Sequence, residues 1–143
     1  MLRRLGGLAT LFYPLLALFA LRRWGAQLGP AAVVAKLYPV AVSAVLLFTF
    51  GRSLYAGPPM AERLARLRHP DLSPEAIAYT RKVTVAWCCF FAVNGLIALV
   101  TALWMSDKAW ALYNGLISYL LMAILMGIEF LVRLRVQKAH AQS

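Results

Sequence analysis

Four long apolar stretches, separated by short polar segments, make up most of the chain. No charged side chain occurs in residues 83–106 or in residues 109–128. Each of these runs reaches the roughly 20 apolar residues that cross about 30 Å of hydrocarbon. The pattern therefore predicts an all-α fold, a four-transmembrane-helix bundle in a single membrane domain of residues 1–143. The predicted spans cover about residues 5–21, 31–50, 83–105 and 109–130.

The segment between the second and third stretches, residues 52–82, is predicted to be a structured loop. Met60, Leu64 and Leu67 share one helical face at about 100° per residue. Arg63 and Arg68 border that face, whereas Glu62 and Arg66 point away from it. This pattern is typical of an amphipathic helix that lies in the membrane interface, with apolar side chains in lipid and arginines at the headgroups.

A second helix is predicted to begin within the same loop. Ser73, Pro74 and Glu75 have the spacing of an N-cap, a first helical residue and an acid in the first turn. No helix-breaking residue follows before the third apolar stretch, so this helix is expected to continue through Arg81 and Lys82 into the membrane. We refer to residues 58–82 as the platform.

Composition and charge exclude a soluble domain. The chain has 143 residues, is 62% hydrophobic and carries 15 Lys and Arg against 5 Asp and Glu, a net charge of +10. A soluble domain of this length has too small an interior for that apolar content. Because the basic residues flank the predicted spans, we expect them to meet anionic lipid, and no nucleic acid partner is expected.

The distribution of basic residues predicts the orientation of the chain. One side of the predicted bundle holds only Arg22, Arg23 and Lys108. Because the more basic side is normally cytoplasmic, both termini and the loop of residues 52–82 are predicted to face the cytoplasm. The basic residues on that side are Arg3, Arg4, Arg52, Arg63, Arg66, Arg68, Arg81, Lys82, Arg133, Arg135 and Lys138.

Polar residues inside the spans suggest helix packing. The tetrapeptide NGLI occurs twice, so that Asn94 precedes Gly95 and Asn114 precedes Gly115. In lipid an amide needs a partner and a glycine allows close approach, so both pairs are predicted to pack helices within the chain or in a homo-oligomer. Near the end of the last span, Glu129 is predicted to form a local ion pair with Arg133.

Candidate chemistry is sparse. His69 and Asp71 flank Pro70 in the platform, where an imidazole and a carboxylate would be a base and its orienting group. No serine or cysteine nucleophile stands beside them, so a cap for the neighbouring helices is the favoured interpretation. Cys88 and Cys89 are adjacent within a span and have no metal-ligand spacing, so neither a metal nor a cofactor is predicted.

Three runs in the second half of the chain resemble a known family. They are HPDLSPEAIAYTRKVT, WCCFFAVNGLIALVTALW and LYNGLISYLLMAILMGIEFLVR. The chain is similar over residues 63–135 to small four-helix inner-membrane proteins of Gram-negative bacteria that accompany aryl polyene pigment biosynthesis. The resemblance implies a bacterial inner-membrane location beside fatty-acid-synthase-like enzymes and acyl carrier proteins.

Three functions remain open at this stage. The first is a non-enzymatic accessory protein whose Arg63, Arg66, Arg68, Arg81 and Lys82 bind an acidic acyl carrier protein or anionic lipid headgroups. The second is a small transporter or lipid-handling subunit, for which bends at Pro14 and Pro39 would form a groove between helices. The third is a membrane acyltransferase that uses His69.

Overall fold

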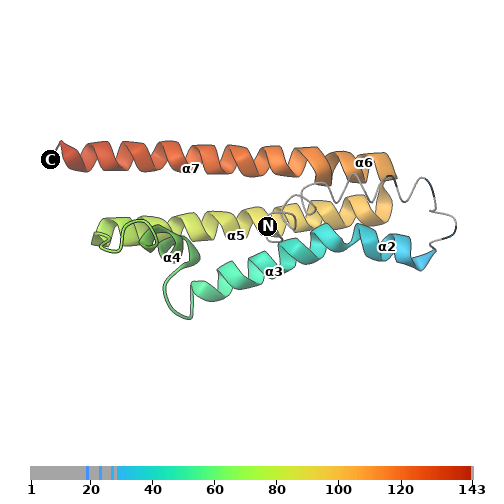
Figure 1. Ribbon diagram of the computed structural model, residues 1–143, viewed down its shortest axis with the longest axis horizontal. Helices are drawn as coiled ribbons and strands as arrows, with labels where there is room; N and C mark the ends of the chain where they lie inside the picture. The colour runs from blue at the N-terminus through green and yellow to red at the C-terminus, as the bar shows by residue number, and fades with distance from the viewer. Residues whose placement is uncertain (1–18, 20–22, 24–26, 28, 143) are drawn as a thin grey trace, which may run out of the picture. The chain divides into compact units, whose positions relative to one another are not determined.

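The computed structural model describes residues 19, 23, 27 and 29–142, and these are mostly helical without a strand (Figure 1). The all-α prediction is therefore confirmed. Three described segments are long and apolar enough to cross a membrane, namely Pro30–Ser53, Pro74–Trp104 and Asp107–Ala139. The predicted first span lies outside the described residues, apart from Phe19. Pro14 and the arginines at the start of that span are likewise outside them.

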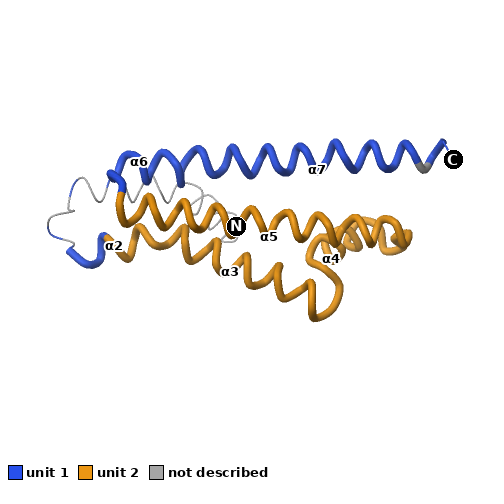
Figure 2. Tube along the Cα trace, turned by 180° about the vertical axis from the view of Figure 1, so that it is seen from behind, with its two compact units in different colours: residues 1–32, 105–143 blue, residues 33–104 orange. Residues whose placement is uncertain are grey.

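The chain divides into two compact units, drawn in different colours in Figure 2. The unit of residues 33–104 contains α3 (Tyr38–Ser53), α4 (Met60–Arg66) and α5 (Pro74–Trp104). The other unit combines residues 1–32 with residues 105–143 and contains α6 (Asp107–Leu112), a π-helical turn η1 (Tyr113–Ile117) and α7 (Ser118–Ala141). The single membrane domain stays a prediction.

The second predicted span is built from two consecutive helices. The short helix α2 (Pro30–Lys36) leads through Leu37 into α3. The Leu37 N–H donates to the carbonyl oxygens of both Val33 and Val34, each at 3.1 Å. The helix is interrupted here because Pro39, in the first turn of α3, has no N–H to donate to the preceding turn.

Helices α3 and α5 form an antiparallel hairpin (Figure 1). Ser43 bonds to Asn94 in the first half of α3, and Phe50 contacts Phe91 farther along, with ring centroids 5.2 Å apart at 78°. Such edge-to-face rings add to the packing free energy beyond the area that they bury. The hairpin provides the frame on which α4 rests.

The start of α5 follows the sequence prediction. The Ser73 Oγ accepts a hydrogen bond from the Ala76 N–H at 3.2 Å, and Pro74 and Glu75 occupy the first turn. The predicted N-cap is therefore confirmed. One helix of 31 residues, about 46 Å long, runs from this cap through Lys82 to Trp104.

In the unit drawn in blue in Figure 2, a wider π-helical turn joins α6 to α7 in one helical run. Its Ser106 caps α6 by accepting from the Ala109 N–H at 3.2 Å. The π-helical turn η1 then contains Asn114, whose Nδ2 donates to the Trp110 carbonyl at 2.9 Å. On α7, Arg133 and Glu129 form the predicted ion pair at 2.6 Å, which is thereby confirmed.

Candidate functional site

Two hydroxyl groups from outside α4 hold the beginning of that helix. The Met60 N–H donates to Ser53 Oγ at 2.9 Å, and the Ala61 N–H donates to Thr84 Oγ1 at 3.1 Å. Both hydroxyls are buried, and Pro59 at the N-cap position has no side-chain acceptor of its own. An isolated helix of seven residues is too short to be stable in water, so these contacts with the hairpin stabilise α4.

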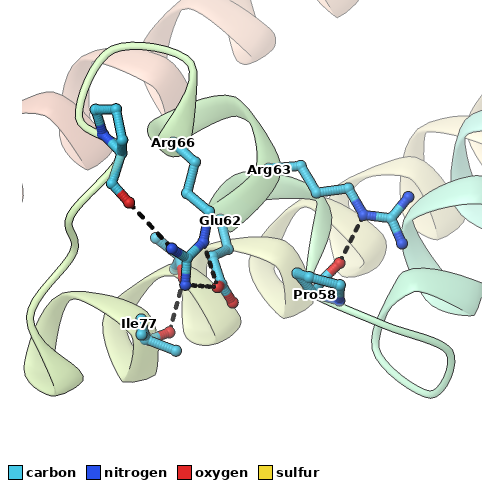
Figure 3. A network of polar contacts seen from close by, with 7 residues as sticks. Pro58, Glu62, Arg63, Arg66 and Ile77 are labelled. Carbon is cyan, nitrogen blue, oxygen red and sulfur yellow. Dashed lines mark hydrogen bonds and ion pairs between the residues drawn. The ribbon is translucent and has the colours of Figure 1, made fainter.

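Helix α4 runs antiparallel to the first part of α5. Its first turn lies at Thr84, whereas Arg66 in its last turn points toward Ile77 (Figure 3). The predicted helix therefore exists, and it packs antiparallel to α5. The capping hydroxyls of Ser53 and Thr84 fix where α4 begins, and its position in the membrane interface stays a prediction.

The polar face of α4 is the packed face. Glu62 is only 5% exposed, whereas Leu64 is 56% and Leu67 is 81% exposed. Arg66 neutralises the buried carboxylate, since its Nη2 and Nε lie 2.6 and 2.8 Å from Glu62 Oε1. A buried carboxylate is costly without such a partner. Leu64 and Leu67 of the predicted apolar face are therefore exposed, whereas Glu62, which was predicted to point away from that face, is buried.

Arg66 also stabilises the turn that follows α4. Its Nη1 donates to the Pro70 carbonyl at 3.1 Å, in the turn that contains His69 and Asp71. The side chains of His69 and Asp71 are exposed, and within the described residues no hydrogen bond joins them. The geometry does not pair this imidazole with a carboxylate that would orient it.

Two further arginines converge on the α3–α4 loop, residues 54–59. Arg63 donates from Nε to the Pro58 carbonyl at 2.8 Å and from Nη2 to the Ala56 carbonyl at 3.3 Å. Arg81, on α5, donates from Nη1 to the Leu54 carbonyl at 3.1 Å. Carbonyls of one short loop thus orient guanidinium groups from two different helices.

Glycine at position 57 is required by the shape of this loop. The backbone of Gly57 has φ +101°, a conformation that side chains rarely tolerate, and a Cβ there would lie 3.1 Å from Arg63 Nη2. A larger residue would therefore strain the backbone and displace the Arg63 guanidinium.

The five basic residues predicted to bind a partner thus fall into two groups. Arg63, Arg66 and Arg81 each donate hydrogen bonds to backbone carbonyls of the same unit. The side chains of Arg68 and Lys82 are exposed and make no hydrogen bond or ion pair with any residue that the structure describes. Sequence reasoning treated the five as equivalent, because a sequence pattern does not identify carbonyl acceptors.

The predicted packing residues lie in the two different units. Asn94 Nδ2 donates to Ser43 Oγ at 3.2 Å, and both residues are buried. A Cβ built on Gly95 would lie 3.1 Å from Ser43 Cβ, so α3 and α5 approach closely at this level. Asn114 and Gly115 lie in the π-helical turn, where Asn114 bonds to its own helix. The repeated tetrapeptide therefore has two different local environments.

Sequence reasoning missed Ser53 and Thr84, which position the platform. Both are hydroxyl residues at the ends of apolar stretches, and that is the only signal by which they could have been noticed. Among the described residues, no group of three His, Cys, Asp or Glu side chains comes together as a metal site. Comparisons with family models, with curated proteins and with solved structures found no match.

Proposed function

We propose that this chain is a non-enzymatic integral protein of a bacterial inner membrane whose platform binds anionic lipid headgroups on the cytoplasmic side. In this proposal the chain crosses the membrane four times and both termini are cytoplasmic. Three helices of spanning length support it, as does the excess of basic residues on one side of the predicted bundle, eleven against three.

The length of α5 supports a position for the platform at the headgroups. Trp104 is exposed at one end of α5, where an indole favours the interfacial layer. Thr84 precedes Trp104 by twenty residues, which is about 30 Å of helix and equals the thickness of the hydrocarbon. Thr84, and with it the start of α4, then lies at the inner hydrocarbon boundary.

The order of charges along α5 and α4 is the observation that carries the proposal. Arg81 and Lys82 lie three and two residues before Thr84, and Arg63 reaches back to the α3–α4 loop beside the start of α4. Asp71 and Glu75 lie at the other end of the platform, farther from the hydrocarbon. In this proposal Arg63, Arg81 and Lys82 lie at the level of lipid phosphates, and Asp71 and Glu75 lie farther toward the cytoplasm.

An acidic carrier protein would approach from the cytoplasm and meet that acidic end first. Arg68 is the exposed cation of the platform nearest to it, and one such residue gives little electrostatic complementarity. Lipid is therefore the favoured ligand.

A role in aryl-polyene-type biosynthesis is supported by the resemblance of the three sequence runs. Loss of pigment on deletion of the gene would test that role.

Lipid retained by the purified protein tests the proposed function. The full-length chain is extracted in polymer discs without detergent, and its lipids are compared with those of the whole membrane. Enrichment of phosphatidylglycerol or cardiolipin at least twofold over the bulk membrane supports the proposal. Lipids in bulk proportion, together with salt-sensitive capture of acyl carrier protein, would replace it with carrier docking.

A further inference from the structure

We propose that the α3–α4 loop contains a binding site for the phosphate group of an anionic phospholipid, between the guanidinium groups of Arg63 and Arg81. This inference rests on the proposed function and names the place within the platform where the headgroup binds. It sets these two arginines apart from the other cations of the chain.

Both guanidinium groups reach the same few residues. Their acceptors, the carbonyl oxygens of Leu54 and Ala56, belong to residues two positions apart, so at most about 7 Å of extended chain separates them. Arg63 comes from α4 and Arg81 from α5, so folding of this unit brings both guanidinium groups to the same loop although they are distant in sequence.

The carbonyl bonds hold the two guanidinium groups in place without using all of their donors. A guanidinium has five N–H groups. Arg63 uses Nε and Nη2, and Arg81 uses Nη1, and neither has another partner among the described residues. The remaining donors are oriented before a ligand arrives, and the planar fork of arginine matches two oxygens of a phosphate.

The loop is open on its outer side. Both arginines are exposed, and Tyr55 between their acceptors is 92% exposed. A tyrosine ring has an apolar body and a polar tip, which suits the boundary between acyl chains and headgroups. Arg81 also places a positive charge at the C-terminal end of α3, where the helix dipole would otherwise repel an anion.

The position of the loop favours a lipid phosphate over a soluble one. Leu54 follows Ser53 directly, and Ser53 bonds to the first residue of α4, which begins at the level of Thr84. With Thr84 at the hydrocarbon boundary, the loop lies where phospholipid phosphates are found and the acyl chains extend beside α3.

The test compares two pairs of substitutions that remove equal charge. Arg63→Gln with Arg81→Gln removes the site, whereas Arg68→Gln with Arg135→Gln removes two exposed cations that make no bond to a described residue. Each full-length protein is titrated with phosphatidylglycerol and with phosphatidylcholine in detergent, and bound lipid is counted by native mass spectrometry. We expect the first pair to weaken phosphatidylglycerol binding at least tenfold and the second pair less than threefold.

Conservative variants separate loss of the site from loss of the fold. Arg63→Lys with Arg81→Lys keeps both charges but not the planar fork, and it is expected to bind with intermediate affinity. Far-ultraviolet circular dichroism and the thermal midpoint report whether each protein is folded. If the glutamine double variant is unfolded, the lysine double variant decides the question. Wild-type affinity of the lysine double variant for phosphatidylglycerol would then overturn the two-arginine site.

The other outcomes are distinct. Equal losses in both pairs would overturn the site and leave general lipid attraction, and with it the proposed function, intact. A wild-type protein without preference for phosphatidylglycerol would overturn both proposals. Inorganic phosphate at about 10 mM would largely occupy a site with a Kd of about 1 mM. If phosphate at that concentration displaces the lipid, the site is assigned to a soluble phosphate. Capture of acyl carrier protein that is lost only in the Arg63 and Arg81 pair would assign it to a protein.

Discussion

Gly95→Ala tests how closely α3 and α5 approach each other. A Cβ at this position would lie 3.1 Å from Ser43 Cβ, closer than ordinary van der Waals contact. Accommodating it requires the two helices to separate slightly or Ser43 to shift away from Asn94. Both movements also strain the hydrogen bond between Asn94 Nδ2 and Ser43 Oγ, which is 3.2 Å long.

Two opposing contributions determine the size of the effect. Added volume in a packed interface costs about 1–3 kcal/mol. Replacing glycine by alanine within a helix recovers about 0.5–1 kcal/mol of intrinsic helix propensity. We therefore expect Gly95→Ala to lower the free energy of unfolding by about 1 kcal/mol, and by no more than about 2.5 kcal/mol.

Gly51→Ala is the matched control within the same unit. Gly51 also lies inside a helix, and a Cβ there would meet nothing within 4 Å. Only the propensity contribution remains, so this variant should be more stable than the wild type by about 0.5–1 kcal/mol. Both variants are measured by titration with sodium dodecyl sulfate in mixed micelles, with circular dichroism as the signal and refolding as the test of reversibility.

A double-mutant cycle identifies the contact. Ser43→Gly removes the atom that the new methyl group would meet, so Gly95→Ala should cost less in that background by the overpacking contribution, about 1–3 kcal/mol. If Gly95→Ala stabilises the protein as much as Gly51→Ala does, the close approach of α3 and α5 is refuted. A coupling energy near zero would refute the role of Ser43 in it.

Three further measurements test other contacts. Asn94→Leu should lower the free energy of unfolding in the same titration by about 0.6–2 kcal/mol, the range for hydrogen bonds between helices in lipid, and an unchanged value would mean that its bond to α3 contributes nothing. Thr84→Val removes the acceptor of the Ala61 N–H. Loss of about 1 kcal/mol at this cap should make hydrogen exchange at the Ala61 amide roughly fivefold faster, and the same exchange rate as in the wild type would contradict this. Glu129→Gln should cost less than about 0.5 kcal/mol because its partner Arg133 is partly exposed, and a loss above about 1 kcal/mol would show that this pair is more than a local contact.

The sequence predicted the elements whose signals are local. The N-cap of α5 and the ion pair of α7 depend on residues three or four positions apart, such as Ser73 with Ala76 and Glu129 with Arg133. Apolar length likewise predicted three of the described helices. Each of these features is determined by neighbours along the chain, so periodicity and spacing are sufficient evidence.

The direction of α4 could not be predicted in this way. Its capping hydroxyls come from Ser53 and Thr84, which lie 7 and 23 residues from the groups that they bind. The amphipathic pattern correctly separated Leu64 and Leu67 from Glu62, but it could not tell which face would be buried. A paired carboxylate packs against α5 because Arg66 is close enough to neutralise it.

The candidate site also combines features that are visible in the sequence with features that depend on contacts between distant residues. Basic residues are visible in a sequence, whereas the carbonyls that orient Arg63 and Arg81 belong to a loop whose shape depends on the positive φ of Gly57. Spacing along the chain gives no indication that residues 63 and 81 meet at one loop. The composition of the platform was therefore predictable, and its division into oriented and exposed cations was not.

The capping of α4 also implies an order of events during synthesis. Ser53 leaves the ribosome before α4, but Thr84 follows the Ala61 amide by 23 residues and becomes available only when α5 has been made. Until α5 packs against α3, a seven-residue helix has neither its second cap nor the surface on which Glu62 is buried. Ordering of α4 is thus a late event, and it signals that the hairpin of α3 and α5 has closed.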